Sequence, residues 1–244
     1  MIGPAAACAV EFYQGYAYAD GYEPWLYRES HWLYTRDGVQ QRLVIYSCPD
    51  GAAFVRKHVD TGPGEAIPDI DLIDGRAGYR EGVQSLNGRR EVFTQAAAGA
   101  PVRRALLPAP APPNAVIDAG FDAFVRQHWD ALNCAGISPV AFLVPSELHY
   151  LNFSARVLRG EHGADGELRW FRLSLANWYG FALPHIDVAY DRTSQQLRVY
   201  SGVSNIRDGR GNNLNVTIRF PATERRDNVN LAEIDRAAAT LLNG

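Results

Sequence analysis

The sequence predicts a mainly β protein with two helices (α+β), in which an antiparallel meander forms a curved sheet or incomplete barrel covered by a helix at residues 119–133. Three observations predict this fold: short alternating segments that end in turn residues, a helical apolar stripe in mid-chain, and a second run of alternating segments. With 47% hydrophobic and 21% charged residues, the chain can bury a sizeable core. We expect a single globular domain over residues 10–244.

The first hundred residues predict a meander of hairpins. Turn residues close each alternating segment, as at Asp37–Gly38, Pro49–Gly51 and Asp74–Gly75. Asn87–Gly88 lies between two further segments, and this dipeptide is typical of a two-residue hairpin turn. Hairpins that follow one another in this way place neighbouring strands antiparallel.

A helix is predicted after the connector Pro108–Pro113, which must lie on the surface because its prolines lack backbone donors. Asp118 can cap this helix. Side chains at spacings of three and four then form one stripe: Phe121, Phe124, Val125, His128 and Leu132. The stripe indicates that the helix covers one face of the meander. A terminal helix is expected at Leu231–Leu242, capped by Asn230.

The second half of the chain returns to alternation with a period of two. In this pattern Phe171, Leu173 and Leu175 point to one side of a strand, and the residues between them point to the other. Strands are expected at residues 140–144, 151–158, 168–175, 186–190, 197–203 and 214–220. One face of this second sheet region should therefore be buried.

Residues 1–9 are small and apolar, and Ala7–Ala9 fits the small-x-small rule for signal-peptidase cleavage. We interpret the segment as a signal-peptide remnant and expect a periplasmic or otherwise exported protein. Cleavage after Ala9 removes Cys8 and leaves Cys48 and Cys134, which predicts one disulfide. Two alternatives stay open: a lipoprotein anchored to a membrane through Cys8, and a cytoplasmic protein with three unpaired cysteines.

Charge and hydropathy exclude several kinds of partner. The net charge of −3 leaves no cationic surplus for phosphates, so no nucleic-acid binding is expected. No apolar run reaches the roughly 18 to 20 residues that a transmembrane segment requires. Walker, dinucleotide-binding, Cys-x-x-Cys and His-Glu-x-x-His motifs do not occur in the sequence, and we expect neither a cofactor nor a metal site. The oligomeric state is left open.

Two pairs of side chains are candidates for acid–base chemistry. His185 and Asp187 share one face of a predicted strand, because residues two apart point to the same side. Glu29 and His31 are spaced in the same way among aromatic residues, where a desolvated carboxylate can act as a general base. Each pair also has a structural interpretation, as solvent-side residues beside a buried strand in the first case and as part of an aromatic core in the second.

The order of elements over roughly residues 12 to 220 resembles a known architecture. A meander, a covering helix and a late hairpin formed by Ile186–Thr193 and Leu197–Val199 are similar to the incomplete β-barrel of periplasmic lipoprotein-localisation factors. Uncharacterised exported families of proteobacteria are similar in overall texture. The resemblance implies an exported half-barrel whose concave face holds an acyl chain or similar apolar ligand, and it assigns no functional residue.

Three functions follow as hypotheses. The leading one is a carrier of an apolar or lipid-like small molecule held against an aromatic wall, for which the expected wall residues are Trp25, Tyr27, Trp32, Trp170 and Phe171. The second is a hydrolase or isomerase, if the two acid–base pairs converge within hydrogen-bond reach in one cleft. The third is an envelope structural or interaction protein with neither a pocket nor a catalytic site.

Overall fold

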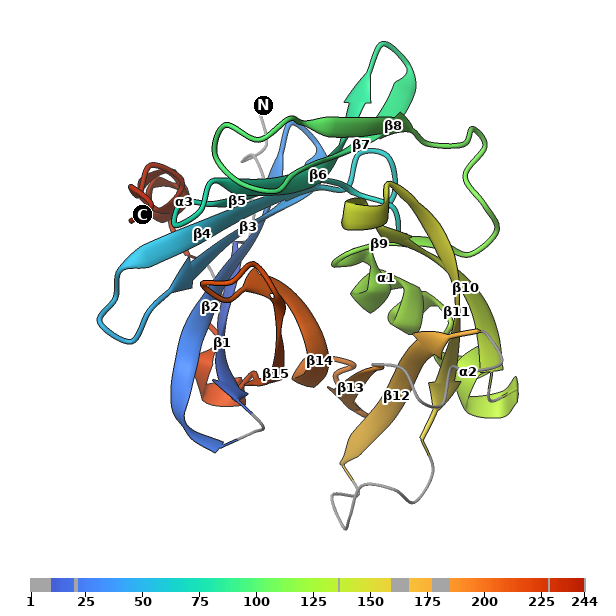
Figure 1. Cartoon of the computed structure of the whole chain (residues 1–244). Coiled ribbons are helices and arrows are strands. Elements are labelled where there is room, and N and C mark those ends of the chain that lie inside the picture. Colours follow the sequence, from blue (N-terminus) through green and yellow to red (C-terminus); the bar gives the residue numbers. More distant parts are fainter. Residues whose placement is uncertain are drawn as a thin grey trace, which may run out of the picture.

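The computed structural model describes residues 10–19, 22–135, 137–158, 167–176, 185–227 and 229–243. These residues fold mainly into strands, and the strands join in one large curved sheet that does not close on itself (Figure 1). The mainly β, barrel-like fold predicted from the sequence is therefore confirmed. The proposed signal remnant at residues 1–9, with Cys8, lies outside the described residues.

The first half of the sheet is the predicted meander, in which each strand pairs antiparallel with the next. Its strands are β1 (Glu11–Ala19), β2 (Tyr22–Arg36), β3 (Val39–Ser47), β4 (Ala53–Asp60), β5 (Asp69–Asp74), β6 (Tyr79–Leu86), β7 (Arg89–Gln95) and β8 (Arg103–Leu106). Asn87 and Gly88 turn the chain between β6 and β7 with φ values of 51° and 73°. Positive φ at both central positions is what a type I′ hairpin requires, as the dipeptide predicted.

The second half of the sheet is built from the later strands. They are β9 (Ala115–Ile117), β10 (Ile137–Val144), β11 (His149–Val157), β12 (Leu168–Leu175), β13 (Ile186–Asp191), β14 (Leu197–Arg207) and β15 (Asn213–Arg219). β9 runs parallel to β10, and β10 to β15 pair antiparallel in sequence order. β15 pairs with β1, with Tyr16 opposite Arg219, and this single pairing joins the halves.

Two helices replace the single one predicted at residues 119–133: α1 (Gly120–Gln127) and α2 (Trp129–Ala135). His128 separates them with φ −106° and ψ 17°, outside the helical region. Asp118 does not cap α1, because Ala119 occupies the cap position without a side-chain hydrogen bond. The Asp118 carboxylate accepts a hydrogen bond of 2.9 Å from the ammonium of Lys57, and the two opposite charges strengthen this bond.

The terminal helix is α3 (Leu231–Ala238), which ends before the predicted Leu242. Asn230 caps it as predicted, since its side chain accepts a hydrogen bond from the backbone N–H of Ala232. Short 3₁₀ turns lie at η1 (Pro145–Glu147) and η3 (Ala222–Glu224). Of the helices that the structure describes, none is long and apolar enough to cross a membrane.

The helices cover opposite faces of the sheet (Figure 1). Phe124 and Val125 of α1 and Leu132 of α2 pack inside the curve, against buried residues of β10 to β13. Ile234 of α3 packs on the outside, against Phe12 and Trp32 of the meander. α1 and α2 thus cover the inner face of the second half of the sheet, and α3 covers the outer face of the first half.

The two ends of the sheet approach each other through side chains. Val59, Ile70, Val83 and Val92 of β4 to β7 share one apolar cluster with Ile117 and Leu143 of β9 and β10. The backbone N–H of Ile117 donates to the carbonyl of Ala66 at 3.0 Å. Side-chain packing therefore replaces strand pairing where a closed barrel would have its last ladder.

The predicted disulfide is wrong, because Cys48 and Cys134 are both free thiols. Cys48 follows β3 and packs beside the aromatic cluster of the meander. Cys134 is exposed on α2, which packs against β10 and β11 in the other half. An even number of cysteines carries no information on whether their Cα atoms come within the bonding range of about 4.4 to 6.8 Å.

Candidate functional site

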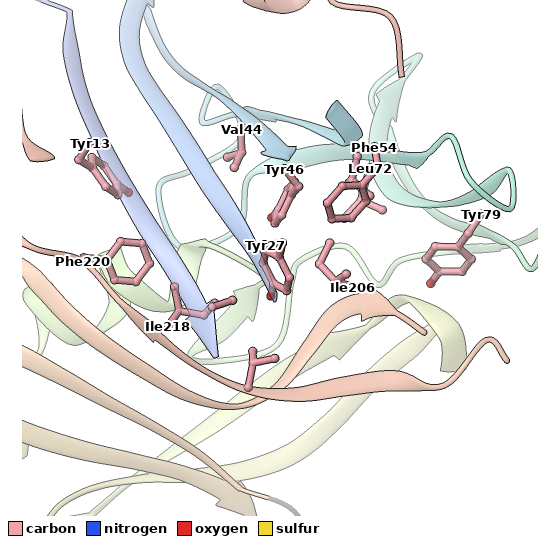
Figure 2. Close-up of a cluster of buried hydrophobic side chains, with 13 residues drawn as sticks. Tyr13, Tyr27, Val44, Tyr46, Phe54, Leu72, Tyr79, Ile206, Ile218 and Phe220 are labelled. Carbon is pink, nitrogen blue, oxygen red and sulfur yellow. The ribbon is translucent and has the colours of Figure 1, made fainter. Parts of the chain in front are cut away.

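A cavity of about 450 Å³ lies on the concave side of the sheet. Both halves line it, and Figure 2 shows Tyr13, Val44 and Tyr46 of the meander facing the same space as Ile218 and Phe220. Part of its wall is aliphatic and aromatic and comes from β10 to β13, with Phe142, Phe153, Leu173, Leu175, Ile186 and Val188. Its volume falls within the range of roughly 300 to 1,000 Å³ that small-molecule sites occupy.

The meander side of the cavity carries buried acidic and basic residues. Glu29 and His31 come from β2, Lys57 from β4 and Glu81 from β6, and each is at most 7% exposed. The pleat explains their shared face: Lys57 lies opposite Leu72, which in turn lies opposite Glu81. Ionisable residues are seldom buried this deeply unless they are paired.

Glu29 and His31 form a hydrogen-bonded pair. Nε2 of His31 lies 3.0 Å from Oε2 of Glu29, which assigns the imidazole proton to Nε2. The His31 ring stacks on Tyr13 at 4.5 Å, and its Nδ1 has no hydrogen-bond partner among the described residues. Burial lowers the pKa of His31, and the Glu29 carboxylate only partly opposes that effect. The ring is therefore neutral at pH 7.

Lys57 is the only lysine of the chain, and its Nζ donates to Oδ2 of Asp118 at 2.9 Å. Burial alone would lower the pKa of Lys57, but the Asp118 charge outweighs it and the pKa is raised. Burial would likewise raise the pKa of Asp118, but Lys57 and the backbone N–H of Ala119 hold it below its ordinary value. Asn205 of β14 donates to the other carboxylate oxygen at 3.3 Å. This ion pair thus connects β4, the turn before α1, and β14.

Three further contacts of charged residues border the cavity. Tyr79 donates its hydroxyl to Oε2 of Glu81 at 2.6 Å, while burial raises the pKa of the Glu81 carboxyl. The guanidinium of Arg207 lies 3.5 Å from the centre of the Tyr79 ring. Nη2 of Arg42 lies 3.9 Å from Oδ2 of Asp122 on α1. Each of these cations therefore has an acidic or aromatic neighbour.

The predicted acid–base residues divide between the cavity and its surroundings. Glu29, His31 and His185 line the cavity. Nε2 of His185 lies 3.5 Å from Oδ2 of Asp187, but Asp187 is outside the lining and accepts two hydrogen bonds of 2.7 Å from Arg172. Both residues of the pair on β2 thus face the cavity, whereas in the second pair only His185 lines it and the Asp187 carboxylate is bound by Arg172.

The predicted aromatic wall lies elsewhere, because none of its five residues lines the cavity. Tyr27 and Phe171 are buried in the cores of the two halves. Trp32 is on the outer face, where its indole N–H donates to Glu233 of α3. Trp25 packs edge-on against Tyr16, and Trp170 is half-buried on β12.

The aromatic residues that do line the cavity include phenylalanines and five tyrosines that the sequence did not single out: Tyr13, Tyr46, Tyr79, Tyr190 and Tyr200. Lys57 and Asp118 were also missed as site residues. Strand pairing would have found the inward tyrosines of the meander, because residues directly opposite each other on neighbouring strands share one face of the sheet. Glu29 lies opposite Tyr46, and His31 lies opposite Tyr13. No local pattern indicates the Lys57–Asp118 pair, whose members are 61 positions apart.

No protein-family model matches the chain, and no protein of curated function matches it. Among solved structures, the fold is similar to a β-barrel-like protein of the domain of unknown function DUF1849 from Brucella abortus, with a TM-score of 0.52. The identity is 8%, and the match covers 90% of this chain and 97% of that protein. At this identity the likeness shows a shared barrel-like fold. Within the described residues, no three His, Cys, Asp or Glu side chains gather closely enough to hold a metal ion.

Proposed function

We propose that the chain is a non-catalytic binding or carrier protein that holds an apolar, lipid-like small molecule inside its incomplete barrel. The cavity of about 450 Å³, with its aliphatic and aromatic wall over β10 to β13, carries the proposal. Moving hydrocarbon from water onto such a wall is favourable by about 25 cal/mol per Å² of apolar surface buried. The resemblance to lipoprotein-localisation factors supports the same class of ligand.

Binding of a neutral fluorescent probe, N-phenyl-1-naphthylamine, tests the proposal. The wild-type protein should enhance its fluorescence saturably, and Leu175→Trp, which fills cavity space, should weaken binding at least about tenfold. Leu86→Trp is the matched control, because Leu86 is 53% exposed at the end of β6. This variant should bind the probe with the same affinity as the wild-type protein. A wild-type protein that does not bind the probe would contradict the carrier function.

A proton-transfer enzyme is the second candidate, and the hydrogen-bonded Glu29–His31 pair in the cavity favours it. Among the described residues, no serine, threonine or cysteine side chain is hydrogen-bonded to either member, so the pair fits an isomerase better than an acyl-enzyme hydrolase. A hydrolase would be favoured instead if the wild-type protein hydrolysed a p-nitrophenyl acyl ester and His31→Gln lowered that rate more than about tenfold.

We also propose that the protein is exported. Of the two features that predicted export, the disulfide has failed, and the cleavage pattern at Ala7–Ala9 remains. Fractionation of expressing cells, followed by mass spectrometry, should find a periplasmic chain that begins at Val10. A cytoplasmic chain that retains Met1, or a membrane-bound chain acylated at Cys8, would contradict cleavage after Ala9.

A further inference from the structure

Glu29 is a buried cavity carboxylate with a single hydrogen-bond donor among the described residues. It is 7% exposed and lines the cavity, and Oε2 accepts its one hydrogen bond from a neutral imidazole. Within the part of the chain that the structure describes, Oε1 has no donor. Ionised carboxylates have about four lone-pair sites, and buried ones are normally held by several donors or by a cation.

Two of the other cavity carboxylates have cationic partners. Asp118 accepts from Lys57 and Asn205, and Oδ2 of Asp122 forms an ion pair with Arg126 at 2.9 Å. Across the described ranges Glu81, like Glu29, has one donor, the Tyr79 hydroxyl at 2.6 Å, but the charge of Arg207 also acts on Glu81. Within the residues that the structure describes, Glu29 therefore differs from Asp118 and Asp122 in lacking a cationic partner in contact, and from Glu81 in lacking the influence of Arg207.

The cations that line the cavity each have an acidic or aromatic neighbour. Lys57 is bound to Asp118, and Arg42 lies 3.9 Å from Asp122. Arg207 lies over the ring of Tyr79 and its charge acts on Glu81, although its Nε has no hydrogen-bond partner among the described residues. A fatty-acid carboxylate placed beside Glu29 would meet a like charge at a site that offers it no donor.

We propose that Oε1 of Glu29 accepts a hydrogen bond from the head group of the bound molecule, so that the ligand is an amphiphile with a donating head. A protonated amine satisfies this site best, because its hydrogen bond to a carboxylate is charge-assisted, and a hydroxyl satisfies it second best. The hydrocarbon tail occupies the apolar wall over β10 to β13. This inference rests on the proposed carrier function and specifies its ligand class.

Three ligands with the same twelve-carbon tail separate the head group from the tail: dodecylamine, 1-dodecanol and dodecanoate. In competition with N-phenyl-1-naphthylamine at pH 7, dodecylamine should bind the wild-type protein at least about tenfold more tightly than dodecanoate, with dodecanol between them. Glu29→Gln should weaken dodecylamine about tenfold and change dodecanol less than about threefold. The amide oxygen at position 29 can still accept from His31, so the ring keeps its place.

Asp235→Asn is the control, since it makes a carboxylate-to-amide change on the outer face of the sheet, away from the residues that line the cavity. It should leave the affinity for dodecylamine within about threefold of wild type. Dodecanoate binding as tightly as dodecylamine, or equal losses in the two variants, would overturn the role of Glu29 and leave the carrier function standing. Failure of the wild-type protein to bind the probe would overturn both. Should Glu29→Gln not fold, the wild-type order of the three ligands decides the question.

Discussion

The two halves of the sheet use their inner faces differently. Over β10 to β13 the inner face is apolar and lies partly under α1 and α2. Over β2 to β6 it carries Glu29, His31, Lys57 and Glu81, and these face the cavity. Burial of the first surface stabilises the fold, whereas desolvation of the second opposes it unless pairing compensates. The two sides of the cavity therefore differ: one is an apolar wall over β10 to β13, and the other carries charged residues whose burial lowers stability unless they are paired.

The largest expected effect is in the apolar half. Phe171 is fully buried between Trp129 and Tyr190, and Phe171→Ala should lower the free energy of unfolding by about 3 to 5 kcal/mol. Urea denaturation measures the loss. Leu86→Ala, at an exposed position, should change stability by less than about 0.5 kcal/mol, and a similar loss there would contradict the assignment of the core.

In the charged half, Lys57→Met should cost about 3 kcal/mol, because it leaves the Asp118 carboxylate buried without its cation. Adding Asp118→Asn removes that charge, and the double variant should return to within about 1 kcal/mol of wild type. Asparagine tolerates the φ of 43° at this position and still accepts from Asn205.

The ion pair of Arg36 with Asp235 is the control for this prediction, because its side chains are 49% and 67% exposed on the outer face. Asp235→Asn should change stability by less than about 0.5 kcal/mol. If the double variant at positions 57 and 118 were no more stable than Lys57→Met alone, the pair would be a net source of stability, and the contrast between the halves would fail.

The smallest predicted effect is the pH dependence that His31 contributes. Its pKa is lowered in the folded state, so its contribution to stability is present above the unfolded value of about 6.5 and is lost as the pH falls through the folded pKa. One proton can change stability by at most about 1.4 kcal/mol per pH unit. Between pH 7.5 and 5.5, wild type should therefore lose more stability than His31→Gln in urea denaturation.

The contributions of other titrating groups to the pH dependence of stability cancel when wild type is compared with His31→Gln. The pKa of His58 is also lowered, and that of Glu81 is raised, so the Glu81 contribution falls as the pH rises. Both groups are present in wild type and in His31→Gln. Equal losses in the two proteins would show that the buried imidazole does not change its protonation between the folded and unfolded states.

Most of the fold could be predicted because its signals are local. Asn87 and Gly88 specify a hairpin through their own φ values, and Asn230 caps α3 through an amide two residues away. The split at His128 and the position of Asp118 could not be predicted in this way. Asp118 satisfies the cap pattern as a sequence, but Lys57 reaches it from β4 only in the folded chain.

The same reasoning separates the parts of the site. Glu29 and His31 were found as a pair because a spacing of two on one strand fixes their common face. The tyrosine wall and the cavity depend on which strands face each other across the curve, and that follows from the pairing of β1 with β15. Aromatic density around Trp25 and Trp32 predicted a wall, but alternation places Trp32 on the outer face under α3.

That pairing of β1 with β15 also determines when the sheet can be completed. During synthesis β1 to β8 can form hairpin by hairpin from neighbouring segments, but the partner of β1 emerges only after all the other described strands. Until then β1 has one free ladder edge, flanked by the tyrosines at positions 13, 16 and 18. The seam that joins the halves is thus the last ladder to form and the step most exposed to pairing with another chain.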